Sequence, residues 1–290
     1  MAEISLQTIR RGVLRAFAAS LALATAGAAV AQPRDVDPFH LGYAVAFGSG
    51  AYRLSDGTET RVVRGSFSKR LRETPSAAEG GPGLRLLFPV TVGVQNLDDA
   101  DLPPDRPTDR AEYVAFLPGI ELEFPAGERL TLRARGQLGW GKELQGSEQA
   151  VRLGAAGVRS RLVWPRAAGR PAWISGLLWA AFDPDEGERQ AMLRFTQALE
   201  FEVDVPRWQF RDRPMRLLPH VLGDWYYRPP PALAYGDGDF EQLEREAQIG
   251  VAAGREGGFK ILWFRFDAIG IAYRFSEHSD GIRFYLNSIF

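Results

Sequence analysis

The chain has 290 residues, of which 35 are Lys or Arg and 36 are Asp or Glu, giving a formal net charge of −1. A near-neutral balance argues against nucleic acid as a partner, because binding to phosphate backbones relies on an excess of basic residues. The lack of cysteine excludes a disulfide framework and any thiolate-ligated metal.

The first 31 residues predict a cleavable secretory signal peptide. Arg10 and Arg11 belong to a basic start, an apolar stretch covers 16–30, and an Ala-Val-Ala sequence ending at Ala31 has the form of a cleavage site. The apolar stretch is short for a membrane-spanning helix, and no later run reaches that length. We therefore expect residues 32–290 to be one exported domain, which could cross a membrane only as a closed barrel.

The exported domain shows the two-residue periodicity of β-strands. Leu130 and Leu132 alternate with Thr131 and Arg133, for example, and turn residues separate successive segments. The pattern predicts an all-β fold, an antiparallel transmembrane barrel of about twelve strands. We expect these strands at 39–49, 58–70, 83–95, 110–124, 128–140, 148–164, 172–183, 188–205, 213–227, 241–253, 258–276 and 281–290.

Two segments break the alternation. It changes parity near Gly157, which predicts a β-bulge within 148–164. It changes again near Asp267, which indicates either a tight turn or a bulge within 258–276. The bulge keeps the number of strands even, as in single-chain bacterial barrels, and makes 254–257 a short connection between strands.

The run 281–290 alternates an apolar face with a mostly polar one and closes on an aromatic residue. It resembles the terminal strand of bacterial outer-membrane β-barrels, apart from Ser288, where an apolar residue is commoner. The resemblance implies a Gram-negative outer-membrane location, contact with membrane lipid, and recognition of this strand by the barrel-assembly machinery. The recognised face would carry Phe284, Leu286 and Phe290. The size and strand number also resemble the solitary autotransporter-type barrels.

In such a barrel the apolar strand faces meet lipid and the polar faces meet the lumen. Aromatic residues near strand ends would form an interfacial girdle, namely Tyr113, Trp140, Trp164, Trp225, Tyr226 and Tyr227. The residues expected to line the lumen are Arg133, Arg135, Arg152, Arg194, Glu200, Glu202, Asp204, Arg216, Arg274 and Arg283. Opposed Arg and carboxylate ladders would brace the lumen and set its ion preference. The expected function is non-enzymatic: a small porin-like channel, a translocator-like barrel or a structural envelope protein, with small solutes as conceivable partners.

Two alternatives stay open, a lipid-acting membrane enzyme and a soluble periplasmic β-sandwich. Four residues of strand separate His220 from Asp224 by roughly 13 Å, too far for a direct hydrogen bond. The stretch from His278 to Gly281 loosely resembles a motif of outer-membrane phospholipase A, although its spacing differs and a turn explains it equally well. We therefore predict no catalytic residue, no cofactor and no metal site.

Overall fold

The structure, a computed structural model, describes one compact part of the chain. The chain divides into two units, Met1–Val36 and Asp37–Phe290, and every described residue belongs to the second. The predicted signal peptide and Phe290 lie outside the described residues. Those residues are 48–54, 59–75, 81–96, 110–145, 150–165, 169–185, 189–210, 212–227, 244–261, 264–277 and 279–286.

Alternating side chains build fourteen strand segments. In the segment Ala172–Pro184, for example, Ile174 and Leu178 are buried on one face, while Trp173 on the other is 43% exposed. The segments are β1 (Ser49–Leu54), β2 (Glu59–Arg72), β3 (Gly83–Asn96), β4 (Arg110–Phe116), β5 (Gly119–Pro125), β6 (Leu130–Gln145), β7 (Ala150–Val163), β8 (Ala172–Pro184), β9 (Gln190–Glu200), β10 (Val203–Phe210), β11 (Arg213–Tyr227), β12 (Arg245–Ile261), β13 (Phe264–Phe275) and β14 (Ser279–Leu286). Among the described residues, no helix is long and apolar enough to cross a membrane.

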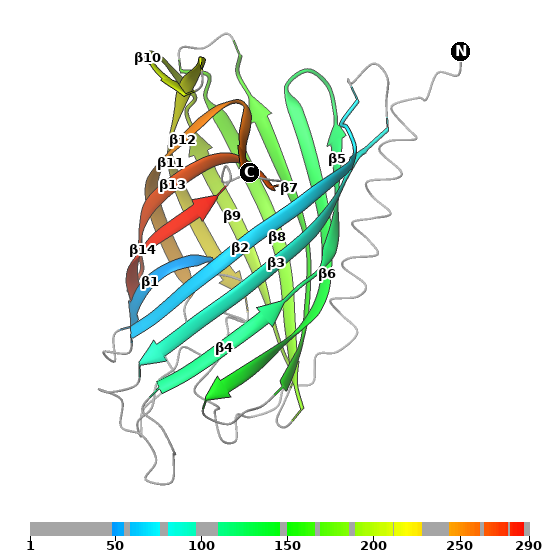
Figure 1. Cartoon of the computed structure of the whole chain (residues 1–290), viewed down its shortest axis with the longest axis vertical. Coiled ribbons are helices and arrows are strands. Elements are labelled where there is room, and N and C mark those ends of the chain that lie inside the picture. Colours follow the sequence, from blue (N-terminus) through cyan, green and yellow to red (C-terminus); the bar gives the residue numbers. More distant parts are fainter. Residues whose placement is uncertain are drawn as a thin grey trace. The chain divides into compact units, whose positions relative to one another are not determined.

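These segments form one closed antiparallel barrel of twelve strands (Figure 1). Neighbours along the chain pair with each other, and β1 pairs with β14 to join the two ends of the sheet. In that pairing Ser49 lies opposite Phe284 and Leu54 opposite Ser279. Closure removes the two edges that an open sheet would expose. The barrel confirms the predicted fold class and number of strands, and it excludes the β-sandwich.

Fourteen segments make twelve strands because two strands are each interrupted beside a proline: Pro118 lies between β4 and β5, and the break between β9 and β10 lies opposite Pro219 of the neighbouring strand β11. β4 and β5 keep one register against β3 and β6 on both sides of Pro118, and Leu117 N donates to Pro89 O at 3.1 Å. β9 and β10 likewise keep one register along β11, where Phe201 N donates to Pro219 O at 2.9 Å. A proline supplies no N–H, so it interrupts the ladder without ending the strand.

The hairpin of β12 and β13 lies elsewhere than predicted. The expected strand 258–276 is divided, because β12 continues to Ile261 and β13 begins at Phe264. The expected short connection at 254–257 is therefore wrong, since those residues lie within β12. The even number of strands survives because this hairpin is displaced along the chain rather than added.

The predicted irregularity at Asp267 lies on the partner strand. The register of β12 against β13 shifts between Gly254 and Phe259, so the extra residues are on β12, opposite Asp267. Gly258 adopts φ 69°, a left-handed conformation that glycine tolerates best. The loss of alternation at Asp267 thus reports a bulge in the strand beside it.

The first strand also differs from the prediction of 39–49. The segment that pairs with both β2 and β14 is β1, residues 49–54, with Tyr52 pointing inward and 7% exposed. Residues 39–47 lie outside the described residues, so the alternation seen there carries no structural statement. The ring closes through the six residues that follow Gly48.

The bulge expected near Gly157 is absent from β7. That strand runs in unbroken register against β6 and β8, with Gly157 opposite both Arg135 and Leu178. Its inward face therefore carries Leu153 and Arg159 at the same parity. The short side chains between residues 154 and 157 hide the alternation from the sequence.

The outward surface of the ring is apolar. Ile269, Ile271 and Tyr273, at alternate positions of β13, are 49%, 45% and 47% exposed. Such a surface is costly in water and suits a hydrocarbon environment. Of the aromatic residues expected at a girdle, Tyr113 and Tyr226 instead lie inside the barrel, at 1% and 8% exposure. Those exposed on the outer surface are Trp140, Trp164, Trp225 and Tyr227.

Candidate lumen site

One level of the lumen is filled by packed apolar side chains, which we call the apolar layer. Its members come from β1, β2, β7, β8, β9 and β11 and from the strand formed by β4 and β5, so they reach inward from opposite walls of the ring. They form one continuous cluster of buried residues. The layer consists of Tyr52, Val62, Tyr113, Ala115, Leu117, Leu153, Ala155, Leu178, Ala180, Phe182, Met192 and Tyr226.

A glycine makes room for Tyr113, one of three tyrosines in the layer. Tyr113 is 1% exposed and lies over Gly93, its register partner on β3. A Cβ atom at Gly93 would collide with the Tyr113 ring. The missing side chain lets the ring lie flat against the wall, and this close approach brings the phenol into the lumen.

Beside the apolar layer lies a polar cavity of about 220 Å³, which we call the arginine chamber. On each wall the two adjoin along one strand face: Val62 is followed by Arg64 on β2, and Met192 by Arg194 on β9. The chamber is lined by seven arginines, Arg64, Arg85, Arg133, Arg135, Arg159, Arg194 and Arg283, and by three acids, Glu121, Asp224 and Asp267.

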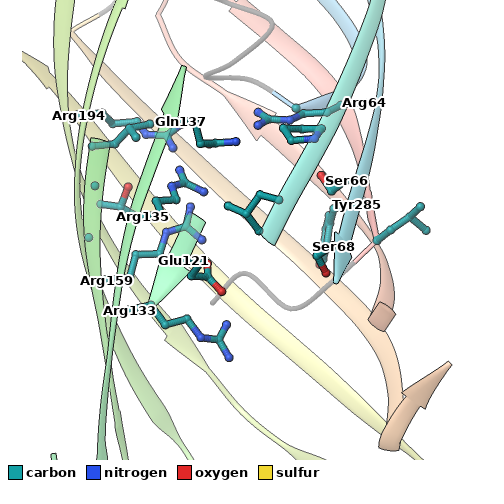
Figure 2. A pocket seen from close by; sticks show the side chains of 18 of the residues that line it. Arg64, Ser66, Ser68, Glu121, Arg133, Arg135, Gln137, Arg159, Arg194 and Tyr285 are labelled. Carbon is teal, nitrogen blue, oxygen red and sulfur yellow. The ribbon is translucent and has the colours of Figure 1, made fainter. Parts of the chain in front are cut away.

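The arginines approach the chamber from several strands. In Figure 2 Arg133, Arg135, Arg159 and Arg194 rise along one side of the cavity, while Arg64 lies across it. Neutral hydrogen-bonding groups complete the wall opposite, where Ser66, Ser68 and Tyr285 lie. The chamber is therefore a polar space surrounded by guanidinium groups.

Two ion pairs brace the wall formed by β3, β5 and β6. Arg133 Nε lies 2.6 Å from Glu123 Oε2, and Thr74 Oγ1 donates to the other oxygen of this carboxylate at 2.8 Å. Arg85 Nη1 lies 3.5 Å from Glu121 Oε1. Cross-strand pairs of this kind tie neighbouring strands together on the inner face, where the charges avoid the apolar outside.

A buried network links β9, β11, β12 and β13. Arg274 pairs with Glu246, and its Nη2 donates to the Tyr226 hydroxyl at 2.6 Å and lies 3.7 Å from Asp224 Oδ2. Arg194 Nε lies 3.7 Å from the other oxygen of Asp224. The charged side chains are all 7% exposed or less, so each ion depends on its partners for solvation.

A third charged group lies where β9 passes into β10. Arg161 Nη2 is 3.1 Å from Glu200 Oε1, and Arg170 Nη2 is 3.1 Å from Glu202 Oε1. Arg170 also reaches Asp204 at 2.6 Å, and Arg216 pairs with Glu202. Exposure rises along this group, from 2% for the Glu200 side chain to 58% for Asp204, so it leads from the lumen toward solvent.

The residues predicted to line the lumen are thus distributed over three groups. Arg133, Arg135, Arg194 and Arg283 line the arginine chamber. Arg274 belongs to the buried network, which Arg194 also joins. The group at the start of β10 contains Glu200, Glu202, Asp204 and Arg216.

Arg152 is placed differently from its prediction. It is exposed and lies opposite Trp140 on β6, a residue of the outward surface that is 60% exposed. Leu153 is buried inside the barrel, and successive side chains of a strand alternate, so its neighbour Arg152 faces outward. The same unbroken parity turns Arg159 into the chamber, where sequence reasoning had not placed it.

Two further chamber residues, Arg85 and Arg64, were missed by the sequence analysis. Arg85 lies between Leu84 and Leu86 on β3, and Arg64 lies two positions from Val62 on the inward face of β2. Their position on the inward-facing parity of each strand was the signal that could have identified them. The structure adds the fact that these arginines converge with those of β6, β7 and β9 on one cavity.

The described histidine has no catalytic partner of the expected kind. His220 Nδ1 lies 3.3 Å from Leu218 O, and its Nε2 lies 3.1 Å from Gln248 Nε2. The Tyr285 hydroxyl is 3.4 Å from Nδ1. Glu200 is the register partner of His220, but its carboxylate pairs with Arg161. His40 and His278 lie outside the described residues.

Metal-binding geometry is likewise missing from the described ranges, where no group of three or more His, Asp or Glu residues is arranged to hold an ion. The chain matches no protein-family model, and a search of curated proteins found no match.

Proposed function

We propose that this protein is a non-enzymatic β-barrel of the bacterial outer membrane whose lumen is closed at rest, so that it serves the envelope as a structural barrel and not as an open pore. The observation that carries the proposal is the apolar layer. Tyr113, Leu117 and Met192 are 1–2% exposed in the middle of what would be the conduction path. Closely packed apolar constrictions exclude water, and ions do not cross them.

The outward surface supports the membrane location. Its exposed apolar residues lie on alternate positions of the strands, whereas arginines on the opposite faces of β6, β9 and β13 point to the lumen, namely Arg133, Arg135, Arg194 and Arg274. That segregation is the one required of strands in hydrocarbon. The contacts of His220 give no support to a lipid-acting enzyme, because they include neither a serine nor a carboxylate.

A planar-bilayer recording tests the closed lumen. We expect the purified wild-type protein to show no stable conductance steps of porin size. Replacing Tyr113 and Phe182 together by alanine removes two large side chains of the apolar layer, and we expect it to produce measurable steps. Leu138→Ala, which removes an outward side chain that is 76% exposed, is the matched control and should stay silent. Stable wild-type steps as large as those of the double variant would contradict the proposal.

We further propose that the barrel-assembly machinery recognises the apolar face of the last strand. Phe284 and Leu286 of β14 point outward and are 54% and 40% exposed, which leaves them accessible to a partner before lipid covers them. We expect Phe290→Ser to lower the amount of heat-modifiable protein in the outer-membrane fraction several-fold, with export unchanged. Asn287→Ser, on the polar face of the run, is the control. Equal recovery of both variants in that fraction would contradict this role.

A further inference from the structure

The arginine chamber has a local excess of positive charge, although the whole chain has no net positive charge. The whole protein carries a formal net charge of −1, yet seven arginines and three acids line this cavity of about 220 Å³. The lining arginines come from six strand segments, so no local repeat in the sequence brings them together. The fold itself assembles a compact cationic space.

The guanidinium groups of the chamber repel one another. Arg159 lies within electrostatic range of Arg135, Arg194 and Arg283, and the low dielectric of a barrel interior strengthens such repulsion. The acids offset part of it: Arg85–Glu121 and Arg194–Asp224 are at 3.5 and 3.7 Å, longer than the 2.6 Å pair of Arg133 with Glu123. Seven arginines and three acids leave an excess of four positive charges among the lining residues, and Glu123, outside the lining, offsets one of these through Arg133.

We propose that the arginine chamber is a binding site for a small multivalent anion that carries phosphate groups. Guanidinium groups present paired N–H donors that match phosphate oxygens, and they keep their charge at any physiological pH. Ser66, Ser68 and Tyr285 offer neutral hydrogen bonds on the facing wall. The cavity volume corresponds to about seven water molecules' share of the liquid, enough for a diphosphate group.

This inference goes beyond the proposed function, because it needs the closed barrel but not its location or its conductance. The phosphate group can belong to a free solute or to a lipid headgroup reaching into the lumen. Both sources present the same phosphate chemistry to the arginines, so an experiment with each is needed to distinguish them.

Pyrophosphate is the probe for the solute. We expect calorimetric titration of the full-length barrel in neutral detergent to show saturable binding of pyrophosphate, and none of chloride at equal ionic strength. Arg135→Gln with Arg159→Gln should weaken that binding at least tenfold, because each removes a charged hydrogen-bond donor. Arg152→Gln, on the outward face of the same strand as Arg159, is the matched control and should bind as the wild type does.

Mixed micelles containing an anionic phospholipid form the second arm. If this lipid competes with pyrophosphate, and the competition is lost in the Arg135/Arg159 variant, the phosphate group belongs to a headgroup. If the lipid leaves pyrophosphate binding unchanged, the phosphate group belongs to a solute. If the double variant does not fold, Arg159→Lys keeps the charge and removes the paired donors, and it should still weaken binding. Wild-type binding of pyrophosphate no tighter than that of chloride, or binding unchanged in these variants, would overturn the proposal.

Discussion

Replacing Arg274 by methionine is expected to lower the free energy of unfolding by about 3–5 kcal/mol, the usual cost of removing one partner from a buried ion pair. Methionine has a similar length but no charge, so Glu246 and Asp224 lose the cation that solvates them. The side chains of Arg274, Asp224 and Glu246 are 1–3% exposed, which leaves no route for water to replace it. Urea unfolding in lipid vesicles, followed by tryptophan fluorescence, gives the value.

A double variant separates charge from packing. Arg274→Met combined with Glu246→Gln removes the orphaned charge while the amide oxygen still accepts a hydrogen bond from Tyr226. We expect the double variant to be more stable than Arg274→Met alone, a positive coupling in a double-mutant cycle. Arg216→Met, whose side chain is 30% exposed, should cost about 1 kcal/mol or less. Equal losses at Arg274 and Arg216 would show that burial does not control the cost.

An arginine on the outward face should be penalised according to its depth. Ile269 lies at the middle of β13 and is 49% exposed, whereas Phe275 is the last residue of that strand, on the same face, and is 43% exposed. In a bilayer we expect Ile269→Arg to cost about 2–4 kcal/mol and Phe275→Arg about 0–1 kcal/mol. Each arginine variant is compared with leucine at the same position, so that lost packing cancels.

The depth dependence is the informative result, because a water-exposed surface would accept arginine at both positions without penalty. Unfolding is measured in vesicles with a lipid of fixed chain length. Costs that are the same at positions 269 and 275 would be incompatible with a membrane-embedded β13 and would remove the main support for the proposed location.

Strand alternation was enough to predict the ring, since most strands keep one parity from end to end. Residues 130–135 of β6 show why: apolar side chains face outward, and Arg133 and Arg135 take the inward positions. Because side chains alternate with a period of two, a strand can turn either of two faces outward, and its apolar face takes that position. Proline did not disturb the prediction at Pro118, because the register continues through it.

The sequence failed where side chains are too small to show parity or where an irregularity belongs to a partner strand. Around Gly157 the short residues gave no alternation, and the bulge inferred there turned Arg152 inward. Near Asp267 the disturbance arises from the extra residues of β12, which a single strand's pattern cannot locate. The arginine chamber itself depends on which strands face each other across the ring, and alternation along a strand contains no such information.

The wall of this ring is taller on one side than on the other. Beyond the start of β8 at Ala172, the line of β9 and β10 continues for seven positions along β11, because a bulge between Val205 and Gln209 takes up three residues of β10; this adds roughly 18 Å of height at a strand tilt of about 40°. The apolar band of such barrels measures only about 25 Å, and a headgroup layer adds less than 10 Å on each side. In the membrane location proposed above, the overhang formed by β10 and β11 would therefore stand clear of the bilayer in an aqueous compartment. It contains Trp208 and Phe210, which are 56% and 46% exposed, and it makes the two ends of the barrel unequal.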